Sequence, residues 1–355
     1  MSAKHGSAGS FRRLLGCAFA LVLALSAVFA ASASAVPVTH SDLALGDSLA
    51  FGYSQQLFNE NEKLGEPASA FEHGYANAYY VTSGAKRAGA QLQNVGCPGE
   101  TTDSLIGTGP LGKGLEGAIP GVHGSTPCLY HLGLGAPLHK EYGAGKSQLE
   151  AALETIAVDA GSGTPVTTLT LDIGANDQLA TVHACEKEVG EEFAKEGKSK
   201  YGATPAGAVK VCLEAHLSGL ITHILTNEGA VLYAIRNGAA FGGINYAGKI
   251  VLQGGYDPYG NVFGTGELLP GSTTLAALIN KYQGEQAATF GACYANPLPT
   301  FNPGGKQEVA RLQKWTNMAN ATEFEGKKNG PDIHPTPTGY HKLGLIMVAQ
   351  CGAVE

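Results

Sequence analysis

The sequence predicts an α/β domain in which helices cover both faces of a mostly parallel sheet. Short apolar segments that end near glycine alternate with longer segments of helical periodicity, which is the pattern of such folds. Hydrophobic residues make up 44% of the 355 residues and charged residues only 15%. The chain can therefore bury the core of one large domain and does not have the composition of a disordered polymer.

Three segments have the composition of buried strands, because they are rich in leucine and β-branched residues and glycine follows each within a few positions. They are residues 38–45, 165–173 and 249–252. Parallel sheets bind their ligands at the carboxyl ends of the strands. A functional site is therefore expected where these three segments end.

Helices are predicted at residues 147–158, 206–227 and 273–286, where apolar residues recur with helical spacing. Residues 107–145 are rich in glycine and show no periodicity, so we predict a long loop insertion there, a feature that is often functional. The chain holds 50 glycines in total, about twice the usual share of about 7%. No linker divides the sequence, so residues 36–355 are predicted to form one domain.

The N-terminus has the three parts of a secretory signal peptide. An apolar run at 14–30 is followed by small residues that end at Ala35, where cleavage is expected. The positive region before that run contains Lys4, Arg12 and Arg13. We therefore predict that residues 1–35 are removed and that the protein is secreted.

Removal of this segment takes away basic residues only, so the mature chain is more acidic than the formal charge of −7 indicates. An acidic chain is a poor partner for nucleic acid or for an anionic membrane surface. We expect no nucleic-acid partner, no membrane span after removal of the signal peptide, and a monomer.

Six cysteines remain after cleavage, an even number that suits an exported protein. None are spaced C-x-x-C, so the sequence gives little support for a zinc site or a thioredoxin-type site. Six cysteines allow fifteen pairings. Sequential pairing would staple three separate regions, and it predicts the disulfides Cys97–Cys128, Cys185–Cys212 and Cys293–Cys351. A redox-active thiol is the alternative.

Four short motifs place reactive or polar side chains at the ends of predicted strands or in loops. They are GDSL at 46–49, NVGCPGET at 94–101, GAND at 174–177 and DIHP at 332–335. A serine hydroxyl becomes a nucleophile when a nearby base accepts its proton, and His334 is the candidate base for Ser48. The N–H groups of Ser48 and Gly99 and the amide of Asn176 can stabilise an oxyanion.

These four motifs resemble those of the GDSL, or SGNH, hydrolase family, whose name lists a Ser, a Gly, an Asn and a His. The matching residues occur in the family's order over most of the chain: Ser48, Gly99, Asn176 and His334. The resemblance implies a flavodoxin-like α/β/α fold with three layers and about five parallel strands. It also implies ester hydrolysis by a serine nucleophile, with no cofactor and no metal.

The sequence departs from the family pattern in front of the histidine. The family places aspartate three residues before it, where this chain has Pro331, whereas Asp332 lies two residues before His334. In an extended segment, side chains at i and i+2 share one face, so Asp332 can still orient the imidazole. A backbone carbonyl or another acid remains the alternative.

The predicted function is that of a secreted serine esterase or lipase that acts through an acyl-enzyme on carboxylic esters of lipids or small molecules. Phospholipase activity and carbohydrate acetylesterase activity are alternatives within the same fold. A secreted carbohydrate-binding or surface-binding protein on an inactive scaffold is the alternative from another class. Substrate preference is left open, because loops that carry no motif build the substrate pocket.

Overall fold

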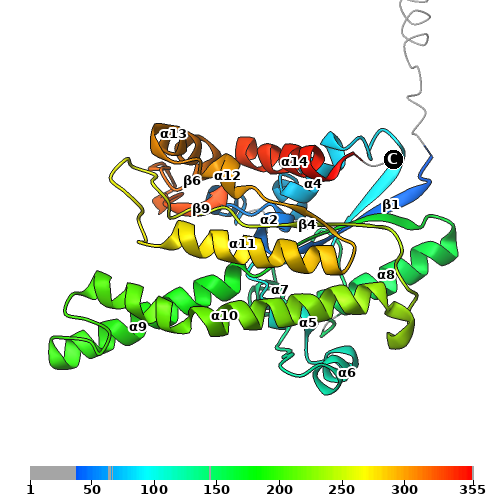
Figure 1. Cartoon of the computed structure of the whole chain (residues 1–355). Helices are drawn as coiled ribbons and strands as arrows, with labels where there is room; N and C mark the ends of the chain where they lie inside the picture. Colours follow the sequence, from blue (N-terminus) through cyan, green and yellow to red (C-terminus); the bar gives the residue numbers. More distant parts are fainter. Residues whose placement is uncertain (1–36, 63–64, 66, 144, 354–355) are drawn as a thin grey trace, which may run out of the picture. The chain divides into compact units, whose positions relative to one another are not determined.

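Five parallel strands form the central sheet of the computed structural model, in the order β2-β1-β3-β4-β5 (Figure 1). The structure describes residues 37–353 apart from 63, 64, 66 and 144, so the predicted signal peptide at 1–35 lies outside the described residues. From Val38 onward, the described chain forms one compact unit. The strands are β1 (His40–Gly46), β2 (Ala90–Asn94), β3 (Val166–Asp172), β4 (Lys249–Gln253) and β5 (Cys293–Ala295).

Side chains alternate between the two faces of the sheet, as the pleat of a strand requires. In β1, Leu43 and Leu45 belong to the larger buried cluster, and Ala44 between them belongs to the cluster on the opposite face. In β4, Leu252 and Val251 divide in the same way. Apolar residues therefore lie on both faces of β1 and β4, as expected for a parallel sheet that is covered on both sides.

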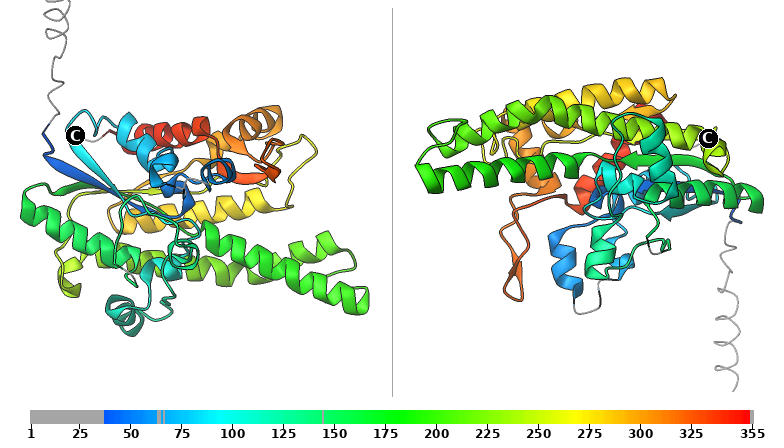
Figure 2. Two further views of the ribbon diagram at one scale, coloured as in Figure 1. Left: turned by 180° about the vertical axis from the view of Figure 1, so that it is seen from behind. Right: turned by 90° about the horizontal axis from the view of Figure 1, so that it is seen from below.

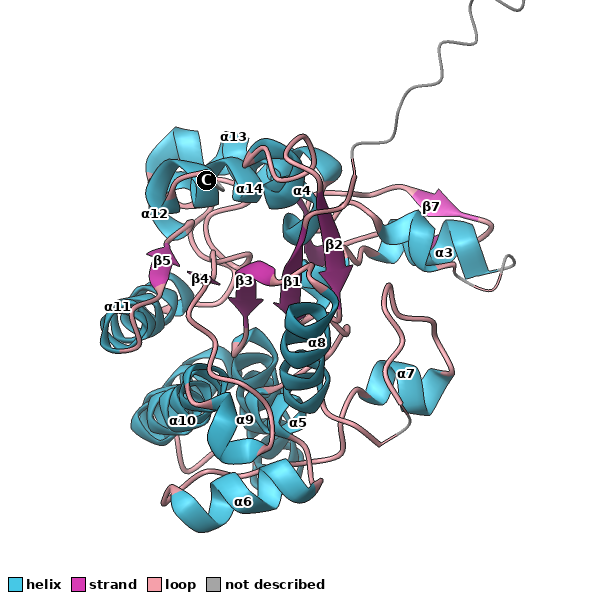
Figure 3. Ribbon diagram, turned by 90° about the vertical axis from the view of Figure 1, so that its right-hand side faces the viewer, coloured by secondary structure: helices cyan, strands magenta, loops and turns pink. Residues whose placement is uncertain are grey.

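Helices cover both faces, so the molecule has three layers (Figure 3). One face carries α5 (Thr102–Ile106), α8 (Gln148–Ser162), α10 (Pro205–Arg236) and α11 (Ser272–Thr289). The other face carries α4 (Tyr75–Thr82), α13 (Gly305–Trp315) and α14 (Pro337–Cys351). The prediction of a three-layer α/β/α fold with about five parallel strands is confirmed.

The three predicted strands correspond to β1, β3 and β4, and the three predicted helices correspond to α8, α10 and α11. The edge strands β2 and β5 match no strand predicted from the residues, because β2 is mostly polar and β5 is only 3 residues long. Other short elements are α3 (Gln55–Asn61), α12 (Leu298–Phe301), β7 (Glu323–Phe324), β8 (Lys327–Lys328) and the 3-10 helices at Ala68–Phe71 and Gly238–Phe241.

The prediction of one long loop at 107–145 is wrong, because two helices lie within it. They are α6 (Pro110–Ala118) and α7 (Leu129–Leu134). Glycine lowers helix propensity by about 1 kcal/mol relative to alanine, so the composition argued against helix here. A Cβ at Gly112 would lie 2.0 Å from the carbonyl oxygen of Gly107, which shows that glycine allows close packing within this segment.

α9 (Ala175–Glu196) and the first half of α10 form a helical hairpin that extends beyond the sheet (Figure 2). No helix was predicted where α9 lies. A small cluster centred on Val189, Ala208 and the buried Cys185–Cys212 disulfide holds the two helices together. This disulfide is one of the three predicted pairs.

Within the described residues, α10 is the one helix that is long and apolar enough to cross a membrane by length and composition alone. Core helices of globular domains pass the same test. The second half of α10 contributes Val231, Leu232 and Ile235 to the larger buried cluster. It also buries Asn227 and Glu228 completely.

Candidate active site

The first site residue lies in the turn that follows β1. Gly46 has φ +137°, and a Cβ there would lie 1.9 Å from a carboxylate oxygen of Asp172. Only glycine fits this approach, and it lets the chain turn directly into α2 (Ser48–Phe51). Asp47 caps this short helix by accepting a hydrogen bond from the Leu49 N–H at 2.8 Å. The turn therefore places Ser48 as the first helical residue at the carboxyl end of β1.

Ser48, His334 and Asp332 form a continuous chain of hydrogen bonds. The Ser48 Oγ lies 2.8 Å from His334 Nε2, and His334 Nδ1 lies 2.5 Å from Asp332 Oδ1. A carboxylate accepts from the Nδ1–H, which leaves Nε2 unprotonated and able to accept the serine proton. This is the geometry that activates a serine hydroxyl as a nucleophile.

The segment that carries the histidine is extended. β9 (Asp332–Pro335) pairs in antiparallel fashion with β6 (Thr316–Asn317), so Asp332 and His334 point to the same face. The second oxygen of Asp332 accepts from the Gln55 N–H at 2.9 Å, which fixes the carboxylate. In the structure the partner of His334 Nδ1 is thus a carboxylate oxygen of Asp332.

Tyr53 packs against the imidazole of His334 with its ring in an edge contact, at a centroid distance of 4.9 Å. On the preceding residue, the carbonyl oxygen of Ile333 accepts a hydrogen bond from the Tyr256 hydroxyl. Tyr53 therefore contacts the histidine ring, and Tyr256 fixes the backbone next to it. The motifs did not identify either tyrosine as part of the site.

Hydrogen bonds bring the four sequence motifs together. The Cys97 N–H donates to the Gly46 carbonyl at 3.0 Å, which ties the Gly99 loop to the turn after β1. Asn176, near the start of α9, donates through Nδ2 to the Glu100 carbonyl at 2.8 Å and to Asp47 Oδ2 at 3.2 Å. The residues predicted from sequence therefore meet in one place.

The backbone N–H groups of Ser48 and Gly99 have no hydrogen-bond acceptor within the described residues. Gly99 has φ +79°, which favours glycine, and open space lies where a side chain would start. Unsatisfied N–H groups next to a nucleophile are the donors that an oxyanion requires. The Asn176 amide, by contrast, uses both of its hydrogens within the protein, and the bond to Asp47 is the longer one.

Glu100 and Gln148 lie behind the Gly99 loop, and both are buried. Gln148 Nε2 donates to Glu100 Oε2 at 2.7 Å. Burial raises the pKa of Glu100 to about 7. This burial and the hydrogen bond from Gln148 indicate that Glu100 has a role within the protein and does not contact substrate. No sequence motif pointed to Gln148, whose amide faces inward from the first turn of α8.

Asp47 and Asp172 form a buried pair of acids beneath the nucleophile turn. Burial raises the pKa of both carboxyls, and for Asp172 the neighbouring Asp47 charge raises the pKa further. Two carboxylates that lie close together in a buried site oppose each other's ionisation, which is why the Asp47 charge adds to the effect of burial on Asp172. Asp172 was not predicted as a site residue. The signal that could have identified it is an acidic residue at the end of a predicted buried strand, where ligands of parallel sheets bind.

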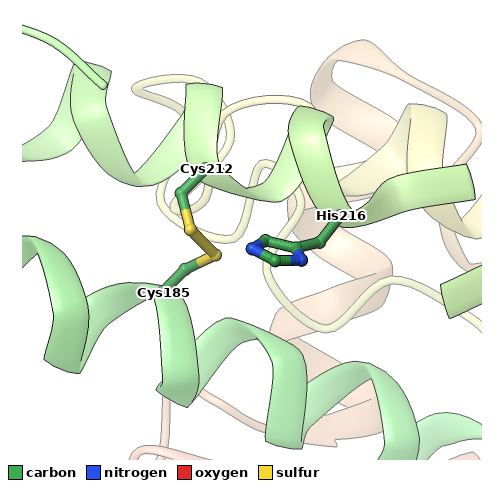
Figure 4. A group of neighbouring side chains, drawn as sticks. All are labelled: Cys185, Cys212 and His216. Carbon is green, nitrogen blue, oxygen red and sulfur yellow. A yellow bond between two sulfur atoms is a disulfide. The ribbon is translucent and has the colours of Figure 1, made fainter. Parts of the chain in front are cut away.

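Disulfides are present at the three predicted pairs, Cys97–Cys128, Cys185–Cys212 and Cys293–Cys351. The first of them closes the loop that carries Gly99. Figure 4 shows the second, with the ring of His216 beside the joined sulfurs. A second group of the same kind consists of Glu100 with the Cys97–Cys128 disulfide. A disulfide has no thiolate that can bind a metal, so neither group is a metal site.

No family model matches the chain, and no curated protein matches it. Solved structures of low sequence identity do match. A phospholipase A1 from Streptomyces albidoflavus is 16% identical, with 89% of this chain and 100% of that chain covered at a TM-score of 0.47. An extracellular lipase from Streptomyces rimosus is also 16% identical, with 88% and 99% covered at a TM-score of 0.48.

A variant of an acetylxylan esterase from Geobacillus stearothermophilus is 12% identical, with 90% of this chain and 96% of that chain covered at a TM-score of 0.42. The chain is thus similar over most of its length to three kinds of ester-cleaving protein.

Proposed function

We propose that this protein is an exported serine ester hydrolase. The hydrogen-bonded chain from Ser48 through His334 to Asp332 carries the proposal. The motif resemblance to SGNH hydrolases supports it. The predicted signal peptide and the three disulfides support export.

In the proposed reaction, Ser48 Oγ attacks the ester carbonyl carbon while His334 Nε2 accepts its proton. The carbonyl oxygen becomes an oxyanion held by the free N–H groups of Ser48 and Gly99. Asn176 joins them when the oxyanion replaces Asp47 as the acceptor of its longer hydrogen bond. His334 then protonates the leaving alcohol, and water hydrolyses the acyl-serine by the reverse sequence of proton transfers.

Asp332 holds the imidazole in the tautomer that this sequence needs and stabilises the imidazolium formed during the reaction. The proposed substrate is an ester of a lipid or a small molecule. No metal and no cofactor takes part in any proposed step, and we propose that the protein acts as a monomer.

A fluorophosphonate probe tests the nucleophile. We expect stoichiometric labelling of the wild type at Ser48 and no labelling of Ser48→Ala. Hydrolysis of an aryl acetate should fall in Ser48→Ala by on the order of 10⁴-fold or more. Ser218→Ala is the matched control, since Ser218 is an exposed serine of α10 and its loss should leave both measurements unchanged.

A wild-type protein that the probe does not label, with hydrolysis equal in wild type and Ser48→Ala, would contradict the proposal. That outcome would favour a binding protein on an inactive scaffold.

A further inference from the structure

An apolar pocket of about 100 Å³ lies between α9, α11 and the loop that follows β4. Helix α9 contributes Leu179 and Val182, and α11 contributes Leu275, Ala276 and Ile279. Val182 and Ile279 are buried, and the other three are half-buried, so their carbon atoms form the walls of a recess. Nothing in the proposed chemistry uses these five side chains.

Two of the residues that line this pocket are sequence neighbours of candidate site residues. Ala175 lines it and directly precedes Asn176, the proposed oxyanion donor. Ile333 also lines it and directly precedes His334. Tyr256, a third lining residue, donates its hydroxyl hydrogen to the Ile333 carbonyl and so belongs to both places. A substrate carbonyl between Asn176 and His334 would therefore have the pocket beside it.

The polar residues of the pocket have partners within the protein. Asp257 accepts hydrogen bonds from the hydroxyls of Ser272 and Thr273, each at 2.7 Å. Asn280 accepts from the Gly255 N–H at 2.9 Å and donates to the Gly255 carbonyl at 2.8 Å. A sugar ring needs polar partners in its site, and these groups are already occupied. Alkyl carbon suits such a surface better.

We infer that this pocket binds the alkyl chain of the acyl group, so that the substrate class is an ester of a medium or long fatty acid and not an acetyl ester. The inference rests on the proposed ester hydrolase function and specifies its substrate. The volume supports it, because one water molecule needs only about 10–15 Å³ of such space. The pocket thus has room for several methylene groups.

The prediction concerns how the rate depends on chain length. Each methylene that leaves water for an apolar site contributes about a four-fold gain in binding. For the wild type, kcat/KM on aryl esters should rise by about this factor per methylene from acetate through butyrate to hexanoate, and then level off when the pocket is full.

Ala276→Phe tests the pocket by filling it from the α11 side. The ratio of kcat/KM for octanoate to that for acetate should fall by at least about ten-fold. Ala277→Phe is the matched control, because Ala277 is the next residue of the same helix and is exposed. Its ratio should equal that of the wild type.

Val182→Thr is a second variant in case Ala276→Phe does not fold. It keeps the shape of the side chain and adds a hydroxyl to the opposite wall, which should lower the same ratio several-fold. Circular dichroism and thermal unfolding identify any variant that fails to fold.

The two proposals fail in different ways. If Ser48→Ala retains the acetate activity, the hydrolase proposal is wrong. If hydrolysis depends on Ser48 but the wild type prefers acetate, or if both pocket variants keep the wild-type ratio, then the acyl-pocket inference is overturned and the hydrolase proposal stands.

Discussion

The side-chain amide of Gln148 forms two hydrogen bonds with the backbone of Gly46. Its Oε1 accepts from the Gly46 N–H at 2.9 Å, and its Nε2 donates to the Gly46 carbonyl at 2.8 Å. The same Nε2 donates to Glu100. One buried amide therefore fixes the strand end before Ser48 and the residue after Gly99, so it holds the backbone next to the two residues that carry the free N–H groups.

Gln148→Met keeps the size of this side chain and removes its hydrogen bonds. It leaves buried polar groups on Gly46 and Glu100 unpaired, each at a cost of about 1–3 kcal/mol in the free energy of unfolding. We also expect kcat for an aryl ester to fall by about ten-fold to a hundred-fold with little change in KM, because the oxyanion donors lose their alignment. Urea unfolding and steady-state kinetics measure the two effects.

Gln286→Met is the control for this prediction. Gln286 donates to the Leu225 carbonyl at 2.6 Å, between α11 and α10 and outside the site. Its loss should lower stability and leave kcat unchanged. Equal losses of kcat in the two variants would show that Gln148 has only a general structural role.

Asp332→Asn tests the third member of the hydrogen-bonded chain. The asparagine amide can donate to His334 Nδ1, which leaves the proton on Nε2 and prevents it from accepting the serine proton. A fall in kcat on the order of 10³–10⁴-fold is expected, with folding retained. Asp159→Asn provides the comparison, because Asp159 accepts from Ser41 near the opposite end of β1. Full activity in Asp332→Asn would indicate that a backbone carbonyl or another acid orients the His334 imidazole.

Two disulfides make a matched pair for separating stability from catalysis. Cys97–Cys128 spans 31 residues and Cys185–Cys212 spans 27, so replacing either pair with serine should cost a similar free energy of unfolding, about 3–4 kcal/mol. Only loss of the first pair frees the Gly99 loop. We expect kcat to fall in that double variant and to stay near the wild-type value in the other, measured well below both unfolding midpoints.

Glu228 should make stability depend on pH. It is fully buried, burial raises its pKa from 4.5 to about 8, and Gln283 donates to it at 2.7 Å. Between these two values the folded state holds a proton that the unfolded state has lost. The contribution of Glu228 to stability therefore decreases as pH rises through this window, by up to about 1.4 kcal/mol per pH unit, and the full loss is present above about pH 8.

Glu228→Gln should remove this contribution, so the variant should gain stability relative to wild type as pH rises from about 5 to about 8. Urea unfolding across that range gives the difference curve. For Glu285→Gln, at an exposed position on α11, the free energy of unfolding should change with pH as it does in the wild type. A parallel curve for Glu228→Gln as well would mean that Glu228 is ionised in the folded protein.

The local sequence pattern was sufficient to predict the central strands of the sheet but not its two edge strands. The strands β1, β3 and β4 are buried along almost their whole length and carry leucines, so their composition identified them. β2 is mostly polar and β5 has 3 residues, so neither has the pattern of a strand by itself. Each becomes a strand by pairing with a neighbour, β2 with β1 and β5 with β4. α9 escaped prediction because its buried face is narrow: Val182, Cys185 and Val189 are buried, and most other side chains are charged or exposed.

The sequence by itself determined which residues meet at the site, because the motifs define local backbone structure. These local features are a glycine at positive φ, a capped helix start and an extended Asp-x-His segment. Only the tertiary structure decided what supports them. Gln148 and Asp172 are far from the residues they contact in sequence, and their roles come from burial beside Gly46 and Asp47. The same holds for the apolar pocket, since its walls come from helices that pack together only in the folded chain.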